Sequence, residues 1–181
     1  MTPLRFQPQS ELWPLVDRAF QRDAREIRTL VPAAEVEHVG ATAIPGSITK
    51  GDLDLLVRVP AGDFEPAATA LGGRYAVDQP ANWTDTFASF GEEREGEPPL
   101  GIQLVVSGST VDAAFVALRR LMRSRPDLVG RANELKRHHE GGRPEAYVIE
   151  KRTFFEGLLV EVDPDRFEGG TWPWAEPLTS G

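Results

Sequence analysis

The stretch VEHVGATAIPGSITKGDLDLLVRV, residues 36–59, decides the fold of this chain of 181 residues. Two apolar runs, 36–39 and 53–59, are typical of β-strands, and a loop rich in Gly, Ser and Thr joins them. Alternate side chains of a strand share one face, so Asp52 and Asp54 are expected to project side by side where the second strand begins. Neighbouring carboxylates repel each other unless a cation lies between them. We therefore predict that this pair binds Mg²⁺ or Mn²⁺, which favour oxygen ligands.

The loop before the two acids has the composition of an anion-binding turn. Gly40 and Gly46 permit backbone conformations that are closed to other residues. Backbone amides in such a turn form a cradle for phosphate oxygens, and Mg²⁺ usually shares its protein ligands with substrate phosphates. We therefore predict that Gly40, Ala41 and Thr42 bind the phosphates of a ligand whose metal the acids hold.

A glycine turn followed about a dozen residues later by Asp-x-Asp on a strand is the pattern of the nucleotidyltransferase superfamily. The segment EHVGATAIPG resembles the hallmark of the GrpB-like branch of that superfamily, and the resemblance covers roughly residues 10–160. It implies an α/β (α+β) fold, with a nucleotidyltransferase-like mixed β-sheet, flanking helices and a C-terminal helical segment. We expect one domain over residues 1–161 and an irregular tail over 162–181.

The resemblance also implies a function. A metal-dependent nucleotidyltransferase binds a Mg²⁺-nucleoside triphosphate and transfers a nucleoside monophosphate to a small molecule or a protein. The metal orients the triphosphate and neutralises the charge that develops on the transferred group. Asp52 and Asp54 match the expected catalytic, metal-binding residues. Lys50 can reach a phosphate oxygen as a point charge, or it simply balances the charge of Asp52.

Two departures from the superfamily pattern leave a second function open. Ala41 stands where a serine is usual in both groupings. Active members usually carry a third acid on a later central strand, and the counterpart here, residues 100–106, contains Gln103 and no acid. Asp78 and Asp85 are the candidates from neighbouring strands. The alternative function is a catalytically degenerate domain that binds a nucleotide or a coenzyme A-related ligand, or serves as a helper, without turnover.

The C-terminal half is basic. Between residues 119 and 152, ten Lys or Arg stand against five Asp or Glu, although the whole chain has a net charge of −8. The resemblance implies a phosphate-binding role for Arg119, Lys136 and Lys151, and it adds Tyr147, one helical turn before Lys151. Two alternatives stay open: solvated helix faces often carry arginine, and a tyrosine can simply shield a lysine stem.

Composition argues against several other classes of protein. The chain has no cysteine, which excludes disulfides and thiolate zinc sites. Its negative net charge argues against a protein that coats nucleic acid, and no apolar run approaches the length of a membrane span. The N-terminus lacks the features of a signal peptide, so we expect a cytoplasmic protein. The expected partner is a nucleoside triphosphate or a related phosphorylated ligand, and the oligomeric state is not predicted.

Hydrophobic periodicity predicts the remaining elements. Apolar side chains recur at helical spacing over 10–30, 63–72, 111–125, 128–139 and 144–160, while 74–78, 83–90 and 100–106 are typical of strands. Ser10 is the expected cap of the first helix, after an unstructured lead-in over residues 1–9. His38, next to the glycine turn, either orients a phosphate or forms a hydrogen bond with the backbone.

Overall fold

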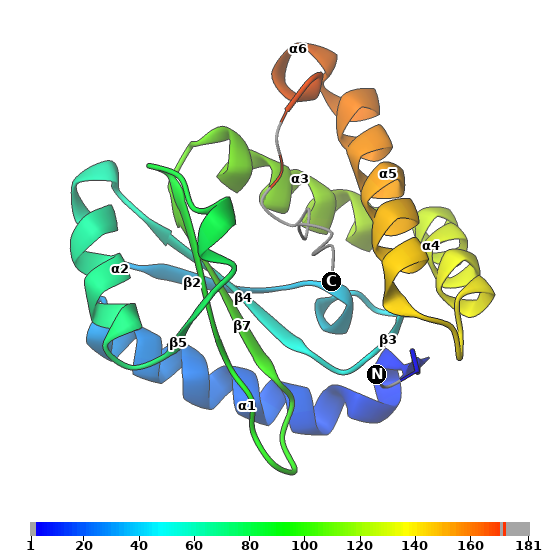
Figure 1. Ribbon diagram of the computed structural model, residues 1–181, viewed down its shortest axis with the longest axis horizontal. Helices are drawn as coiled ribbons and strands as arrows, with labels where there is room; N and C mark the ends of the chain where they lie inside the picture. The colour runs from blue at the N-terminus through cyan, green and yellow to red at the C-terminus, as the bar shows by residue number, and fades with distance from the viewer. Residues whose placement is uncertain (1–2, 171, 173–181) are drawn as a thin grey trace.

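The computed structural model describes residues 3–170 and 172, and its centre is a mixed five-stranded sheet (Figure 1). The strand order is β2-β4-β7-β6-β5, in which β4 and β7 are parallel and all other neighbours are antiparallel. The strands are β2 (Glu35–Val39), β4 (Leu53–Val59), β5 (Ala76–Asp78), β6 (Phe87–Glu92) and β7 (Leu100–Val106). The predicted mixed sheet is confirmed.

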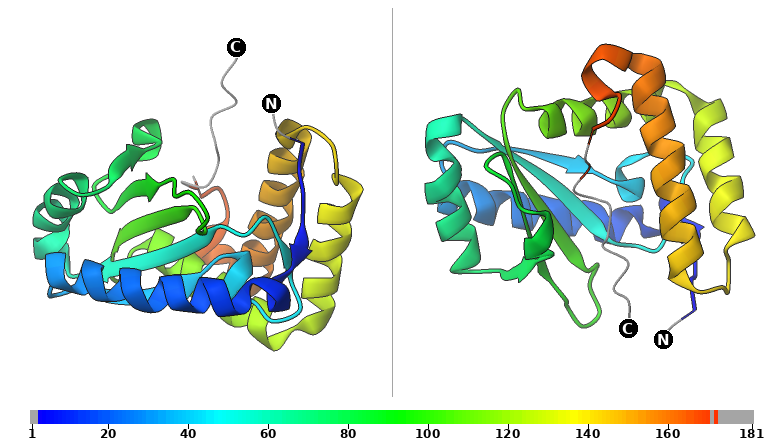
Figure 2. Two further views of the ribbon diagram at one scale, coloured as in Figure 1. Left: turned by 90° about the horizontal axis from the view of Figure 1, so that it is seen from below. Right: turned by 45° about the horizontal axis from the view of Figure 1, so that its top comes forward.

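Helices cover both faces of this sheet (Figures 1 and 2). Two of them, α1 (Gln9–Leu30) and α2 (Phe64–Gly72), pack on one face, and α3 (Thr110–Ser124) packs on the other. The next two, α4 (Pro126–His138) and α5 (Pro144–Val162), pack against each other and against α3. Among the described residues, no helix is both long enough and apolar enough to cross a bilayer.

The alternation of side chains along β4 assigns the acids to one face. Leu53, Leu55 and Val57 are fully buried in the core beneath α1 and α2. Leu56 points to the opposite face, where it packs with residues of α3. Because Asp54 is two residues away from Leu56, its carboxylate lies on the α3 face as well.

The N-terminal segment differs from its prediction. Residues 7–9 are ordered: β1 (Gln7–Pro8) pairs with β3 (Ile48–Thr49), which belongs to the loop before the acids. The helix α1 begins directly after Pro8, and no side chain caps it, so the prediction of Ser10 as its cap is wrong. The predicted strand 83–90 is also shifted: a 3₁₀ turn occupies Pro80–Asn82, and β6 begins at Phe87.

The C-terminal tail contains structure where the sequence predicted none. A short helix, α6 (Pro164–Phe167), follows α5, and Asp163 caps it by accepting a hydrogen bond from the amide of Arg166. Phe167 and the buried Trp172 pack against residues of α3 and α5. Residue 171 and residues 173–181, on which the rest of this prediction falls, lie outside the described part of the chain.

A buried ionic cluster fastens α1 to the loop that joins β6 and β7. Asp23 of α1 is fully buried, and its carboxylate lies 2.7 Å from Nη1 of Arg94 and 2.9 Å from Nε of Arg22. Both arginines also contact Glu97, at the surface of the loop. Asp23 is therefore the fully buried carboxylate of this cluster, and it shares Arg94 with Glu92, whose Oε2 lies 2.7 Å from Nε of Arg94.

We predict that Asp23→Asn destabilises the fold by about 2 kcal/mol, because the substitution weakens the charge-assisted hydrogen bonds that the buried Asp23 carboxylate accepts from Arg94 and Arg22. Urea denaturation of both proteins measures this difference. Glu97→Gln is the matched control: it removes an exposed carboxylate from the same cluster and should change the free energy of unfolding much less. Equal effects of the two substitutions would contradict the assignment.

Candidate functional site

The carboxylate of Asp54 lies between two glycines on the neighbouring strands. In the sheet register, Asp54 is opposite Val39 of β2 on one side and Gly101 of β7 on the other. A Cβ atom on Gly101 would lie 2.9 Å from Oδ1 of Asp54, and one on Gly40 would collide with Oδ2. Gly40 also has a φ of 72°, which glycine adopts without strain. Both positions therefore need glycine so that the Asp54 carboxylate can sit there.

Asp54 carries a partly buried carboxylate that has no direct counter-ion among the described residues. Among the residues that the structure describes, none donates a hydrogen bond to its carboxylate or forms an ion pair with it. Burial, and then the charge of Asp52, raises the pKa of Asp54 to about 6, while Lys151 and Lys50 act in the opposite direction. A cation held beside the carboxylate would favour its ionised form.

Asp52 lies closer to solvent at the mouth of β4. Its Oδ2 is 3.2 Å from Nζ of Lys50. The side chain of Lys50 is 50% exposed and that of Asp52 is 38% exposed. The ion pair fits the simpler interpretation of Lys50, in which it balances Asp52. The charge of Asp52, two residues before Asp54, contributes after burial to the raised pKa of Asp54.

The hydroxyl of Thr42 connects the glycine turn to the strand of acids. Thr42 is buried, and its Oγ1 donates a hydrogen bond to the carbonyl of Asp52 over 2.9 Å. Its single proton is used in that bond, so Nε2 of His38, also 2.9 Å away, must be the donor to Oγ1. The hydroxyl thus fixes the loop geometry, and the predicted contact of Thr42 with phosphate rests on its backbone amide.

The glycine turn forms a short 3₁₀ helix, Ala41–Ala43, which is held from several sides. The amides of Ala43 and Ile44 donate hydrogen bonds to carbonyls of the turn. The amides of Ala41 and Thr42 lie in the first part of the turn, where N–H groups have no partner within the helix. Further backbone groups of the loop bond to three side chains that were not predicted as site residues: Gln9, Arg123 and Asn133.

Of the residues predicted on the C-terminal helices, Lys151 and Tyr147 interact electrostatically with the acids, whereas Lys136 bonds to the loop before them. Lys136 of α4 is buried, and its Nζ donates to Oγ of Ser47 over 3.0 Å and to the carbonyl of Ile48 over 2.6 Å. Burial, and then the charge of Lys151, lowers the pKa of Lys136 to about 8. Lys151 of α5 lies 6.0 Å from the ring centre of Tyr147. Burial and Asp52 raise the pKa of Tyr147 to about 12, so its phenol remains protonated.

Arg119 does not join this cluster. Its Nε donates to the carbonyl of His38 over 2.9 Å, and its Nη1 lies 3.2 Å from Oε2 of Glu37. The charges that shift the pKa of Asp54 are those of Asp52, Lys151 and Lys50, and not that of Arg119. A phosphate-binding role for Arg119 beside the acids stays a prediction that its position does not favour.

Gln103 occupies the place where a third acid would be needed. It is opposite Leu56 of β4, so its side chain lies on the same face of the sheet as Asp54. Asp78 is on β5, three strands from β4 and hence about 14 Å away. Asp85 precedes Phe87, which pairs with Val105, about 13 Å along β7 from Gly101. Neither acid can bridge a metal with Asp54.

The donor set fits a single divalent ion that is shared with a ligand. Across the described residues, no cluster of three or more His, Asp or Glu side chains has metal-binding geometry. Asp52 and Asp54 would therefore supply the protein ligands, and phosphate oxygens and water the others. Mg²⁺ commonly binds in this way, with one or two carboxylates, several waters and substrate phosphates.

A glycine turn that faces paired acids on a mixed sheet defines a nucleotidyltransferase-like fold. Solved structures support this class: the protein is similar to the Cid1 poly(U) polymerase with bound MgGTP, with a TM-score of 0.50, 12% identity and coverage of 72% of this chain and 42% of that one. The likeness is one of fold, over less than half of the polymerase.

The chain belongs to the GrpB protein family, which matches residues 4–161. A UPF0157 protein of Vibrio cholerae serotype O1 is 31% identical over 159 residues, which cover 88% of this chain and 84% of that protein. The crystal structure of the conserved protein GrpB from Enterococcus faecalis superposes with a TM-score of 0.57, at 15% identity and 86% coverage of both chains. The resemblance found in the sequence is thus confirmed.

We predict that His38 makes the stability of the protein dependent on pH. Burial lowers the pKa of His38 to about 4, and Arg119 contributes to the decrease. Between pH 6.5 and 4 the unfolded chain binds a proton that the folded protein does not. The contribution of His38 to stability should therefore be constant above pH 6.5 and fall by about 3 kcal/mol as the pH decreases to 4. Asp54, whose pKa is raised to about 6, contributes with the opposite sign between pH 6 and 4. The difference in stability between the wild-type protein and a variant without His38 isolates the His38 contribution.

Urea denaturation at several pH values measures this slope, and NMR titration gives the pKa of His38 directly. His38→Gln removes the titrating group, so the stability of the wild-type protein relative to the variant should fall by about 3 kcal/mol between pH 6.5 and 4. An NMR pKa near 6.5 in the folded protein would refute the prediction.

Proposed function

We propose that the protein binds a Mg²⁺-bound nucleotide, or a related phosphorylated ligand such as a coenzyme A precursor, at the mouth of β4. The observation that carries this proposal is the Asp54 carboxylate, which two glycines accommodate and which has no counter-ion in contact among the described residues. A charged group in such a position is costly unless a ligand completes its environment.

The surroundings of Asp54 divide into a cation-binding part and an anion-binding part. Asp52 and Asp54 would hold Mg²⁺ or Mn²⁺, which when bound supplies positive charge for phosphate oxygens. The amides of Gly40, Ala41 and Thr42 would contact the phosphates, and Lys151 would add positive charge from α5. Lys136 supports the loop from behind through Ser47 and Ile48, so its contribution is chiefly to position the glycine turn.

Gln103, at the position expected for a third acid, favours binding of the ligand without transfer of a phosphoryl group. A neutral amide at Gln103 provides neither the charge nor the second metal ligand that two-metal phosphoryl transfer uses. Its Nε2 lies 3.7 Å from the position that a Cβ of Gly101 would take, next to the carboxylate of Asp54. Gln103 is thus suited to donate a hydrogen bond to an oxygen in the site. With two carboxylates only, one metal ion and a stably bound ligand are expected.

We predict that Asp54→Asn abolishes Mg²⁺-dependent binding of ATP and leaves the fold intact. The substitution removes the metal ligand charge but preserves the shape that fits between the glycines. Isothermal calorimetry of ATP, with Mg²⁺ and with EDTA, compares the two proteins. Asp85→Asn is the matched control, because it removes one carboxylate at the far end of β7 and should leave the affinity unchanged.

A transfer assay separates binding from turnover in the same proteins. With α-labelled ATP and Mg²⁺ or Mn²⁺, the wild-type protein should retain the label as intact ATP and release no pyrophosphate. Equal ATP affinity of wild type and Asp54→Asn would remove the proposed site. Release of pyrophosphate that depends on Asp54 would instead establish the transferase.

A further inference from the structure

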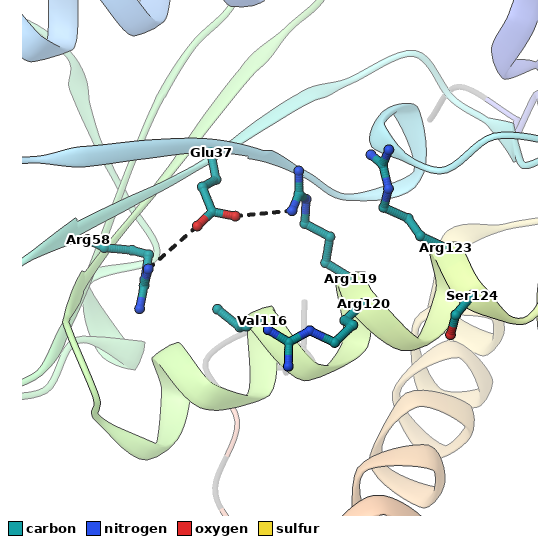
Figure 3. A pocket seen from close by; sticks show the side chains of 7 residues that line it. All are labelled: Glu37, Arg58, Val116, Arg119, Arg120, Arg123 and Ser124. Atoms are coloured by element: carbon teal, nitrogen blue, oxygen red, sulfur yellow. Dashed lines mark ion pairs between the residues drawn. The ribbon is translucent and has the colours of Figure 1, made fainter.

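A pocket of about 540 Å³ lies between β2, β4 and α3, and the paired acids do not line it (Figure 3). Its walls come from the sheet and from one face of α3, and comprise Glu37, Arg58, Val116, Arg119, Arg120, Arg123 and Ser124. The volume is within the range of pockets that hold small-molecule ligands. Four arginines and one carboxylate are therefore the charged groups that line this pocket.

Arg58 is neutralised by the protein itself. Its guanidinium lies 2.6 Å from Asp112, 2.9 Å from Glu35 and 3.5 Å from Glu37. Arg119 shares Glu37, at 3.2 Å, as its one carboxylate partner among the described residues. No carboxylate of the described chain pairs with Arg120 or Arg123. The α3 side of the pocket therefore keeps an excess of positive charge.

Arg119 and Arg123 are also held in place by backbone carbonyl groups. Arg119 donates to the carbonyl of His38, and Arg123 donates through Nη1 to the carbonyl of Ala43 over 3.2 Å. Carbonyl groups carry no net charge, and each guanidinium keeps further N–H groups for a ligand. Figure 3 shows both side chains extended from α3 toward the sheet, with Arg120 beside Val116. The pocket is thus partly organised before any ligand arrives.

We propose that this pocket binds a small phosphoanion with two or more phosphoryl groups, without a metal. Residues 116, 119, 120 and 123 share one helical face, so several guanidiniums converge on one volume. Planar guanidinium groups match phosphate oxygens with paired hydrogen bonds, and a polyanion engages more than one of them. The site is distinct from the proposed Mg²⁺ site, where lysines and carboxylates would share the ligand with a cation.

Calorimetry of pyrophosphate in EDTA and low salt tests the proposal. The wild-type protein should bind pyrophosphate, and Arg120→Gln/Arg123→Gln should weaken the binding at least tenfold, which corresponds to about 1.4 kcal/mol. Arg18→Gln, an exposed arginine of α1 that does not line the pocket, is the control and should retain wild-type affinity. Thermal melts of each variant verify folding, and Arg Nε–H signals in ¹⁵N spectra report the contact in the wild type.

Three results would overturn the proposal. The first is unchanged pyrophosphate affinity in the double variant, and the second is an equal loss in Arg18→Gln, which would indicate attraction by overall charge. The third is pocket-dependent binding of a single-stranded oligonucleotide without binding of pyrophosphate, because the partner would then be a nucleic acid. Since EDTA removes divalent ions, failure of Mg²⁺-ATP to bind at Asp54 leaves this test unaffected.

Discussion

The close approach of one carboxylate to two glycine backbones is the constraint on which the site depends. Asp54 occupies space that Cβ atoms on Gly40 and Gly101 would fill, so three strands must meet in one particular register. A slip of one residue in β4 would turn Asp54 into the core beneath α1 and expose Leu53 or Leu55 on the other face. The apolar core thus fixes the register, and the register positions the charge.

The glycine turn is supported by segments from both ends of the chain. Gln9 bonds to the loop from the start of α1, and Asn133 and Lys136 bond to it from α4. Arg123 of α3 donates to Ala43. Each bond satisfies a polar group of an irregular loop that would otherwise need water. A loop held in this way is preorganised for a ligand, which reduces the ordering cost of binding.

Positions that depend on local spacing could be predicted from the sequence. Positions that depend on tertiary packing could not. Alternation along β4 assigns Asp54 to the face opposite Leu53 and Leu55, and the helix break at Pro126 also followed from local chemistry. Gly101 was missed, although a glycine inside an apolar strand signals a close approach. The contacts of Arg119 with His38 and Glu37 had no local signal, because they depend on how α3 packs on the sheet.

Lysine and arginine are divided between the two basic regions in a way that their chemistry explains. Lys136 is buried behind the glycine turn, and its lowered pKa of about 8 shows that it can lose its charge at modest cost. Arginine cannot do so, and it keeps its charge in every environment. The arginines of α3 lie accordingly at an open pocket, where solvent or an anion stabilises them. A side chain that can lose its charge suits the loop beside the proposed metal site, whereas a permanent charge suits the proposed anion pocket.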